Sequence, residues 1–430
     1  MTKTLEPVST ADELPTSCSV VIIGGGIVGV TAALALAERN ISVVLLEKGQ
    51  IAGEQSSRNL GWIRKTSRHA ADVPLAQAAD RLWAGLPERI GREVGYRQAG
   101  IMFLARTEEQ MAMHERWHAS VEPLALGSQL LTAKDIDQRI PGGIGKWKGG
   151  IHTPSDGYAE PSLATSAIAN AAIKRGAKLI QQCAVRTLVC SAGRVSGVVT
   201  ERGEIRCEQV LLAGGAWSRR FLGNLGVSLP TLPLICSVLR TQPMDGPTDA
   251  AVGGPDFSFR RHQGGGFIIT QRGKLDAPIT LDHLLIGRRY LEQLRTQRSA
   301  LQINVGHAFF NDLGSKRRWK PTSQSPFERV RAHDPAPNAR LNQSALDNLK
   351  AAWPAFDQAR VEEAWAGLID VTPDSIPVID HVRAIPGLVL ATGFSGHGFG
   401  TGPAAGQLAA DLLCGDEPIV DPFPYRFGRL

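Results

Sequence analysis

Three glycines, Gly24, Gly26 and Gly29, have the G-x-G-x-x-G spacing that lets a backbone turn hold a pyrophosphate. The first glycine permits a tight turn, the second lets the backbone approach phosphates at a helix N-terminus, and the third lets that helix lie close to the preceding strand. Glu47, eighteen residues after Gly29, could accept hydrogen bonds from ribose hydroxyls, which disfavours a cofactor with a 2′-phosphate. The chemistry that this pattern predicts is the binding of a dinucleotide.

The elements around the glycines are those that such a turn needs. Ser19 to Ile23 is a short β-branched run typical of a strand buried on both faces. Ile27 to Arg39 carries Ala and Leu at helical spacing, and Ser42 to Leu46 is a second buried strand that ends at Glu47. The sequence therefore predicts a βαβ unit, and its strand, helix and acidic strand end argue against a purely structural glycine turn.

The rest of the chain indicates a flavin rather than a nicotinamide cofactor. A nicotinamide-binding half usually continues as βαβαβ, whereas here a polar stretch from Lys48 to Arg68 follows the second strand. Residues 230 to 345 alternate short strands with loops, which predicts an antiparallel sheet in a separate layer. Buried strands with glycine loops return at 211–218 and 388–403. This discontinuous layout suits a flavin that lies across one domain and is capped by another.

Composition limits the class of protein further. The length of 430 residues predicts two or three folded domains. A content of 43% hydrophobic residues, with a net charge of only +6, excludes a disordered protein. Six scattered cysteines without a C-x-x-C pair argue against a disulfide scaffold. An uncharged run from Cys18 to Ala37 has the length of a membrane span but is interrupted by the glycine turn. We expect a cytoplasmic protein, and leave open a peripheral contact at the inner membrane face.

Several segments together resemble a known family. They are VVIIGGGIVGVTAALALAERNISVVLLEKGQIAGEQSSR (20–58), QCAVR (182–186), QVLLAGGAWSRRFLGNLGVSLPTL (209–232), PFER (326–329) and GPAAG (402–406). The sequence is similar to FAD-dependent oxidoreductases of the D-amino-acid oxidase type, and most similar to bacterial L-amino acid deaminases. The resemblance implies an α/β fold with a discontinuous Rossmann-like FAD-binding domain and an α+β substrate-binding domain with an antiparallel sheet. We expect the FAD-binding domain at 16–90, 156–228 and 360–430, the substrate-binding domain at 91–155 and 229–359, and a tail at 1–15.

The resemblance also implies which residues contact FAD, and it does so segment by segment. The ADP end would be held by the glycine turn and the second strand, and the pyrophosphate and flavin by the loop after it. The helix that opens after the last glycine loop would place its positive end at the flavin pyrimidine and favour reduction. The implied cofactor residues are Gly24, Gly26, Ile27, Val28, Gly29, Glu47, Lys48, Gln55, Ser56, Ser57, Arg58, Asn59, Leu60, Val185, Ala213, Gly214, Trp217, Gly396, His397, Gly398, Gly400 and Thr401.

The substrate residues implied by the resemblance are Arg272, Trp62 and Phe394. An arginine in the substrate-binding domain pairs with the amino acid carboxylate in the deaminases, and its match is Arg272, with a solvated loop arginine as the alternative. His397 is a candidate for deprotonating the amine, with a core histidine as the alternative. Trp62 stands where the family has a polar glutamine, so we expect the substrate to differ from that of the deaminases. Related flavoproteins with covalent flavin carry a histidine at this position, so we expect FAD to be bound non-covalently.

The activity implied is oxidative deamination of an amino acid: hydride passes from Cα to flavin N5, and the imino acid hydrolyses to a keto acid and ammonia. We expect an L-amino acid; a D-amino acid or a cyclic or secondary amino acid is the first alternative. A flavin-dependent tRNA-modifying enzyme is an alternative of another class, although we expect no nucleic-acid partner. Either oxygen or a quinone could accept the electrons. The H-E-x-x-H pattern at His114 to His118 lacks a third ligand, so we expect no zinc.

Overall fold

The computed structural model describes residues 5–430. A six-stranded sheet has the order β20-β21-β12-β1-β2-β8, with every neighbouring pair parallel except β20 with β21. The strands are β1 (Val20–Ile23), β2 (Val43–Leu46), β8 (Lys178–Ile180), β12 (Gln209–Leu212), β20 (Val378–His381) and β21 (Leu388–Thr392). Since β1 and β2 pair in parallel around α1 (Ile27–Glu38), the predicted βαβ unit is confirmed.

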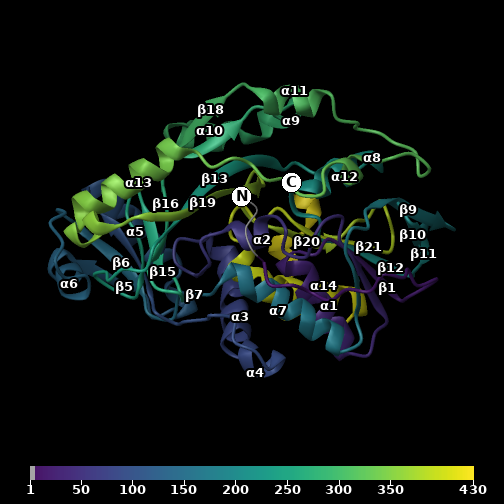
Figure 1. Ribbon diagram of the computed structural model, residues 1–430, viewed down its shortest axis with the longest axis horizontal. Helices are drawn as coiled ribbons and strands as arrows, with labels where there is room; N and C mark the ends of the chain where they lie inside the picture. The colour runs from purple at the N-terminus through teal and green to yellow at the C-terminus, as the bar shows by residue number, and fades with distance from the viewer. Residues whose placement is uncertain (1–4) are drawn as a thin grey trace.

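A ten-stranded sheet forms the second large layer, at the left and upper part of Figure 1. It is mostly antiparallel, with β14 beside β4 and β17 beside β18 as parallel pairs. Its strands are β4 (Ile101–Ala105), β5 (Gln129–Thr132), β6 (Gly149–Thr153), β13 (Leu232–Thr241), β14 (Ala251–Gly253), β15 (Ser258–Arg261), β16 (Phe267–Thr270), β17 (Leu275–Pro278), β18 (Leu301–Asn304) and β19 (Val361–Val371). The fold class predicted from the sequence is confirmed.

The long strand β19 connects the two layers. It pairs along its length with β13 of the ten-stranded sheet, although it begins two residues after 359, the predicted end of the substrate-binding domain. The domain boundaries themselves stay a prediction. Two small sheets complete the strands: β9 (Val185–Ser191), β10 (Arg194–Thr200) and β11 (Gly203–Arg206) form one, and β3 (Trp62–Ile63) and β7 (Gly157–Tyr158) form the other.

Helices cover both sheets. The longer ones are α3 (Val73–Ala84), α5 (Glu108–Ser120), α7 (Pro161–Lys174), α13 (Ala339–Ala352) and α14 (Gly398–Cys414). The shorter ones are α2 (Gln55–Arg58), α4 (Leu86–Ile90), α6 (Ala133–Arg139), α8 (Ser218–Asn224), α9 (Leu281–Ile286), α10 (Leu291–Gln297), α11 (His307–Leu313) and α12 (Pro326–Arg329). Among residues 5–430, no helix is both long and apolar enough to cross a membrane.

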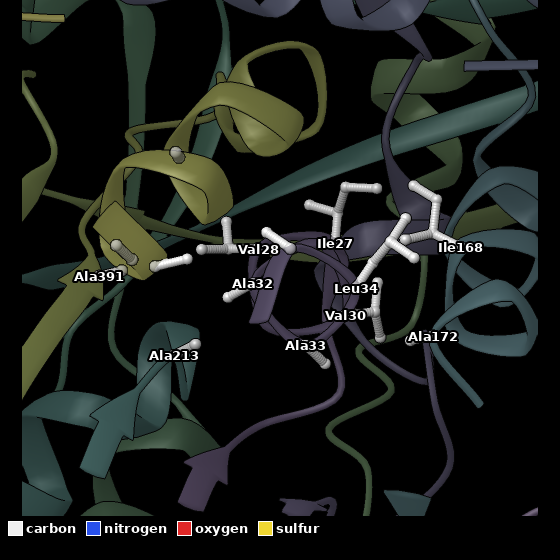
Figure 2. Packing of buried hydrophobic residues seen from close by; sticks show 14 of the residues in the cluster. Ile27, Val28, Val30, Ala32, Ala33, Leu34, Ile168, Ala172, Ala213 and Ala391 are labelled. Carbon is white, nitrogen blue, oxygen red and sulfur yellow. The ribbon is translucent and has the colours of Figure 1, made fainter. Parts of the chain in front are cut away.

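Helix α1 is buried on all sides because it lies between α7 and α14. Figure 2 shows Val30 and Leu34 beside Ile168 and Ala172 of α7, with Ala32 on the opposite side. The approach of α14 is close enough that a Cβ at Gly406 would lie 2.6 Å from the Val28 carbonyl oxygen. This packing fixes the N-terminus of α1 at the carboxyl edge of the parallel sheet, where ligands bind in folds of this kind.

Candidate active site

The glycine turn has the geometry that its sequence predicts. Gly24 has a φ of +114°, and a Cβ there would lie 2.5 Å from the Ala213 carbonyl oxygen. A Cβ at Gly29 would lie 2.1 Å from the Gly24 carbonyl oxygen, so the third glycine lets α1 lie against the turn. Gly26 is the N-cap of α1, and the hydroxyl of Ser56 accepts a hydrogen bond from the Ile27 amide at 2.8 Å. The positive end of α1 therefore opens at this turn.

A cavity of about 280 Å³ begins at the turn and runs to the ten-stranded sheet. Its wall brings together segments that are far apart in the sequence, as a dinucleotide bound in an extended form requires. Most of the predicted cofactor residues line it: Gly24, Gly26, Ile27, Val28, Glu47, Lys48, Gln55, Ser56, Arg58, Asn59, Leu60, Val185, Ala213, Gly214, Trp217, Gly396 and Gly398, together with Phe394 from the predicted substrate set.

Glu47 lies on the cavity wall at the end of β2, where a ribose would be expected. Its Oε2 accepts a hydrogen bond from the Gly25 amide at 2.8 Å, and its Oε1 accepts one from the Gly49 amide at 2.7 Å. Burial raises the pKa of this carboxyl group. Each carboxylate oxygen can accept a further hydrogen bond, so the side chain is held in place while it still has acceptor capacity for a ligand hydroxyl.

Lys48, predicted as an ADP contact, has another role in this structure. Its ammonium group donates to Glu54 Oε1 at 2.7 Å and to the carbonyl oxygens of Val330 and Arg331, both at 2.9 Å. These three acceptors use the three donors of the lysine. The nitrogen also lies 4.5 Å from the centre of the Trp217 ring, whose indole N–H donates to Glu54. Lys48 thus fastens the cavity wall to the segment after α12.

The loop at residues 55–60 is fixed by acceptors from the last third of the chain. Gln55 donates to Asp370 Oδ1 at 3.0 Å, and Asp370 Oδ2 accepts from the Gly393 amide at 2.8 Å. Arg58 forms an ion pair with Asp334 and donates to the Gly53 carbonyl oxygen. Asp370 also lines the cavity. The sequence did not identify it, because its neighbours come from separate segments and no local sequence pattern marks it.

Besides His397, which is described below, four predicted cofactor contacts among the described residues pack beside the cavity without lining it. Gly29 is the helix contact described above, and Ser57 is buried in α2. The Gly400 carbonyl oxygen accepts from the Trp83 indole N–H at 2.8 Å, and the Thr401 hydroxyl donates to the His397 carbonyl oxygen at 3.1 Å. In this structure these residues shape the first turns of α1, α2 and α14 rather than the cavity surface.

Arg272, Trp62 and His397 also lie outside the cavity lining, and two of them, Arg272 and Trp62, contact the Phe103 ring. The Arg272 guanidinium lies 4.1 Å from the centre of the Phe103 ring, and Trp62 packs edge-on against the same ring at 5.4 Å. Burial lowers the pKa of Arg272 to about 10. His397 adjoins the cavity because Gly396 and Gly398, on either side of it, line the wall. Arg272 and Trp62 thus share one aromatic ring, and His397 lies at the edge of the cavity.

Arg64 is a further member of this group that the sequence analysis missed. Its Nη2 lies 2.8 Å from His397 Nε2, and its guanidinium lies 5.5 Å from the centre of the Phe103 ring. Since arginine only donates, His397 Nε2 accepts, and the neutral imidazole carries its proton on Nδ1. Burial, followed by the charges of Arg68 and Arg64, holds the pKa of His397 well below its usual value. Its basic nitrogen is therefore already occupied. We name Trp62, Arg64, Phe103, Arg272 and His397 the arginine cluster.

The two histidines of the H-E-x-x-H pattern are used separately. His118 Nε2 lies 3.0 Å from the Ser128 carbonyl oxygen. The His114 ring packs near Phe103 at 6.5 Å, and burial lowers its pKa to about 4. Within the described part of the chain, no three His, Cys, Asp or Glu side chains gather as metal ligands would.

The chain and its fold are similar to characterised flavoproteins. Residues 19–412 match the family model of DAO, FAD dependent oxidoreductase. A glycine oxidase of Pseudomonas aeruginosa is 29% identical over 96% of this chain and 99% of its own length. The structure of L-amino acid deaminase from Proteus myxofaciens in complex with anthranilate has a TM-score of 0.94 and 32% identity, with 99% and 96% of the two chains covered. L-proline dehydrogenase from P. horikoshii has a TM-score of 0.77 and 26% identity over 97% and 99% of the two chains.

The match over nearly the whole chain agrees with a cavity built around the glycine turn, the end of β2 and the start of α14. The chain belongs to the DAO family of FAD-dependent oxidoreductases and is an amino acid oxidase or dehydrogenase that acts on CH–NH or CH–NH2 groups.

Proposed function

We propose that this chain oxidatively deaminates an amino acid of the L series with non-covalently bound FAD. The observation that carries the proposal is Arg272, a cation two residues after the cavity-lining Thr270, whose guanidinium forms no ion pair within residues 5–430. A planar guanidinium can hold both oxygens of a carboxylate, which every amino acid substrate has. The likeness to the Proteus deaminase supports the L series.

The residues on the cavity wall suit FAD. The amides at the start of α1 and the glycine turn would hold the pyrophosphate, Glu47 a ribose hydroxyl, and Gly396 and Gly398 the flavin ring. FAD, when bound, supplies the acceptor for two electrons. Trp62 offers no nucleophile for covalent attachment at the position where covalent flavoproteins carry histidine. Acid precipitation should therefore release a yellow supernatant, whereas colour that stays with the pellet would contradict non-covalent binding.

The side chains of this protein would position the substrate rather than exchange protons with it. Arg272 would fix the carboxylate, which orients the Cα hydrogen relative to the cavity. Because Arg64 donates to His397 Nε2, we assign His397 to orienting Arg64 and not to removing the amine proton. Val238 and Phe394, both on the wall, exclude water from this end of the cavity.

The test is flavin bleaching without oxygen. The purified holoprotein is mixed with L-amino acids, their D enantiomers and cyclic imino acids, and the flavin absorbance is followed. Bleaching by L-amino acids, lost in Arg272→Gln and partly kept in Arg272→Lys, is the expected result. Preferential bleaching by D-amino acids or cyclic imino acids would move the assignment to that class, and no bleaching by any amino acid would refute the proposal.

The electron acceptor is tested on the same preparation. Hydrogen peroxide formed per keto acid reports an oxidase, and reduction of a quinone analogue at the expense of peroxide reports a dehydrogenase. We propose no acceptor ahead of this measurement, because no described side chain separates the two.

A further inference from the structure

Arg64 is a second partly buried cation beside Phe103, and within the described part of the chain no carboxylate forms an ion pair with it. Its hydrogen-bond partners are the Thr66 carbonyl oxygen and the neutral His397. Burial, followed by the charges of Arg68 and Arg272, lowers the pKa of Arg64 to about 9. Two guanidinium groups thus face one aromatic ring, Phe103, with no anion from the protein in the arginine cluster.

The neighbouring cations of the same segment are paired, which makes Arg64 exceptional. Lys65 lies 2.7 Å from Asp80 and 3.2 Å from Asp156, and Arg68 forms an ion pair with Asp72. A buried charge without a counter-ion destabilises a protein, so the sequence supplies acids where the role is structural. Arg64 feels the charges of Asp156 and Asp72 but forms an ion pair with neither, which leaves its guanidinium available to an anion from outside the protein.

Other atoms of the arginine cluster also lack partners. The Trp62 indole nitrogen is buried and has no hydrogen-bond acceptor among the described residues. Arg272 donates one hydrogen bond among the described residues, from Nη1 to the Gly254 carbonyl oxygen at 3.3 Å. Most N–H donors of the two guanidiniums therefore remain for a ligand with several acceptor oxygens. One α-carboxylate has two oxygens, which a single guanidinium fork already satisfies.

We propose that the substrate is an amino acid with a second carboxylate, bound by Arg64 while Arg272 holds the α-carboxylate. This inference rests on the proposed function and names the class of its substrate. Two carboxylates balance the two guanidiniums, so that the loaded site is electrically neutral at its substrate end. A neutral side chain in the same place would leave the guanidinium of Arg64 without an anion in direct contact.

The first experiment needs no turnover. Unreactive acids are titrated into the holoprotein, and binding is followed by the change in flavin absorbance and by calorimetry. The dicarboxylic acids malonate, succinate and glutarate are compared with the monocarboxylic acids acetate and butyrate. We expect the best dicarboxylate to bind about 10- to 100-fold more tightly than butyrate, as a charge-assisted hydrogen-bonded pair contributes. Equal affinities in the wild-type protein would overturn the proposal.

Variants assign the second carboxylate to Arg64. In Arg64→Gln the preference for dicarboxylates should disappear, and in Arg64→Lys part of it should return. Arg97→Gln is the matched control for lost charge, because its side chain is 65% exposed, and it should behave as wild type. An equal loss of affinity for both classes of acid in Arg64→Gln, with a changed flavin reduction potential, would instead show that Arg64 acts on the cofactor.

Turnover separates this inference from the proposed function. L-Glutamate is compared with L-glutamine and L-aspartate with L-asparagine, since each pair has nearly the same shape and differs in charge. We expect kcat/KM for the better acid to exceed that of its amide at least tenfold. Faster bleaching by the amides or by apolar amino acids would overturn the substrate class and leave deamination standing. If no amino acid bleaches the flavin, deamination fails, and the titrations with unreactive acids still decide whether the site takes two carboxylates.

Discussion

The buried ion pair of Glu160 and Arg260 connects the cavity loop to the ten-stranded sheet. Arg260, on β15, donates from Nη1 and Nη2 to the two carboxylate oxygens of Glu160 at 2.8 and 2.9 Å. Its Nε donates to the carbonyl oxygen of Leu60, which lines the cavity. The two side chains are only 1% and 2% exposed. Removal of Arg260 therefore leaves the Glu160 carboxylate away from water with only the Gln263 amide and His262 beside it.

We predict that Arg260→Met lowers the free energy of unfolding by about 3–5 kcal/mol at pH 7, as loss of one partner of a buried pair does. At roughly 2–4 °C per kcal/mol the thermal midpoint should fall by about 10 °C. Flavin content should fall as well, because Leu60 loses its hydrogen-bond donor. The double variant Arg260→Met with Glu160→Leu should be more stable than Arg260→Met alone, because it removes the unpaired carboxylate.

The pH dependence of this effect follows from Glu160. Burial acts to raise its pKa, but the charge and hydrogen bonds of Arg260 outweigh burial and hold the pKa below 4.5. The pair therefore makes its full contribution to the free energy of unfolding above pH 4.5, and that contribution is lost as the pH falls through the lowered pKa of Glu160. In Arg260→Met the carboxyl group is protonated more easily, so the difference from wild type should shrink in acid. Urea unfolding at several pH values measures it, and a difference that stays constant or grows in acid would refute the reasoning.

Three other variants test the cofactor cavity. Gly29→Ala places a Cβ 2.1 Å from the Gly24 carbonyl oxygen, so we expect the variant to lose FAD, as measured by absorbance. Gly223→Ala is the matched control and should keep its flavin, because no other part of the chain lies within 4 Å of the new Cβ. Glu47→Leu leaves two amide donors without acceptors, and calorimetry with the refolded apoprotein should show FAD affinity lower by at least about tenfold. Trp83→Phe removes the hydrogen bond to the Gly400 carbonyl oxygen and should reduce the free energy of unfolding by about 1 kcal/mol, and an unchanged urea midpoint would count against that bond.

The cofactor end could be predicted from the sequence because its signals are local. Gly24, Gly29 and Glu47 belong to one βαβ unit, and the periodicity of the strands and helix is visible within about thirty residues. Asp370 could not be found in this way, because its contact with Gln55 exists only after β19 has paired with β13. A local pattern identifies a turn, but it does not identify what the turn faces.

Arg64 shows the second reason that sequence reasoning stops short. It lies in a stretch that also carries Lys65 and Arg68, and the three cations are indistinguishable by type or spacing. Only the folded chain shows that Lys65 and Arg68 have carboxylate partners while Arg64 meets His397 and Phe103. A cation that binds a ligand is thus recognised by the lack of a carboxylate partner, and only the folded structure shows that lack.

Because α1 lies between α7 and α14, its packing depends on a helix that is synthesised much later. The glycine turn is synthesised early. Strand β21, which pairs with β12, and helix α14, which packs against α1, follow more than 350 residues later. Without β21 and α14, one apolar face of α1 and one edge of β12 have no cover, and the cavity lacks its wall at Gly396 and Gly398. The cavity can therefore be completed during folding only after α14 has been synthesised.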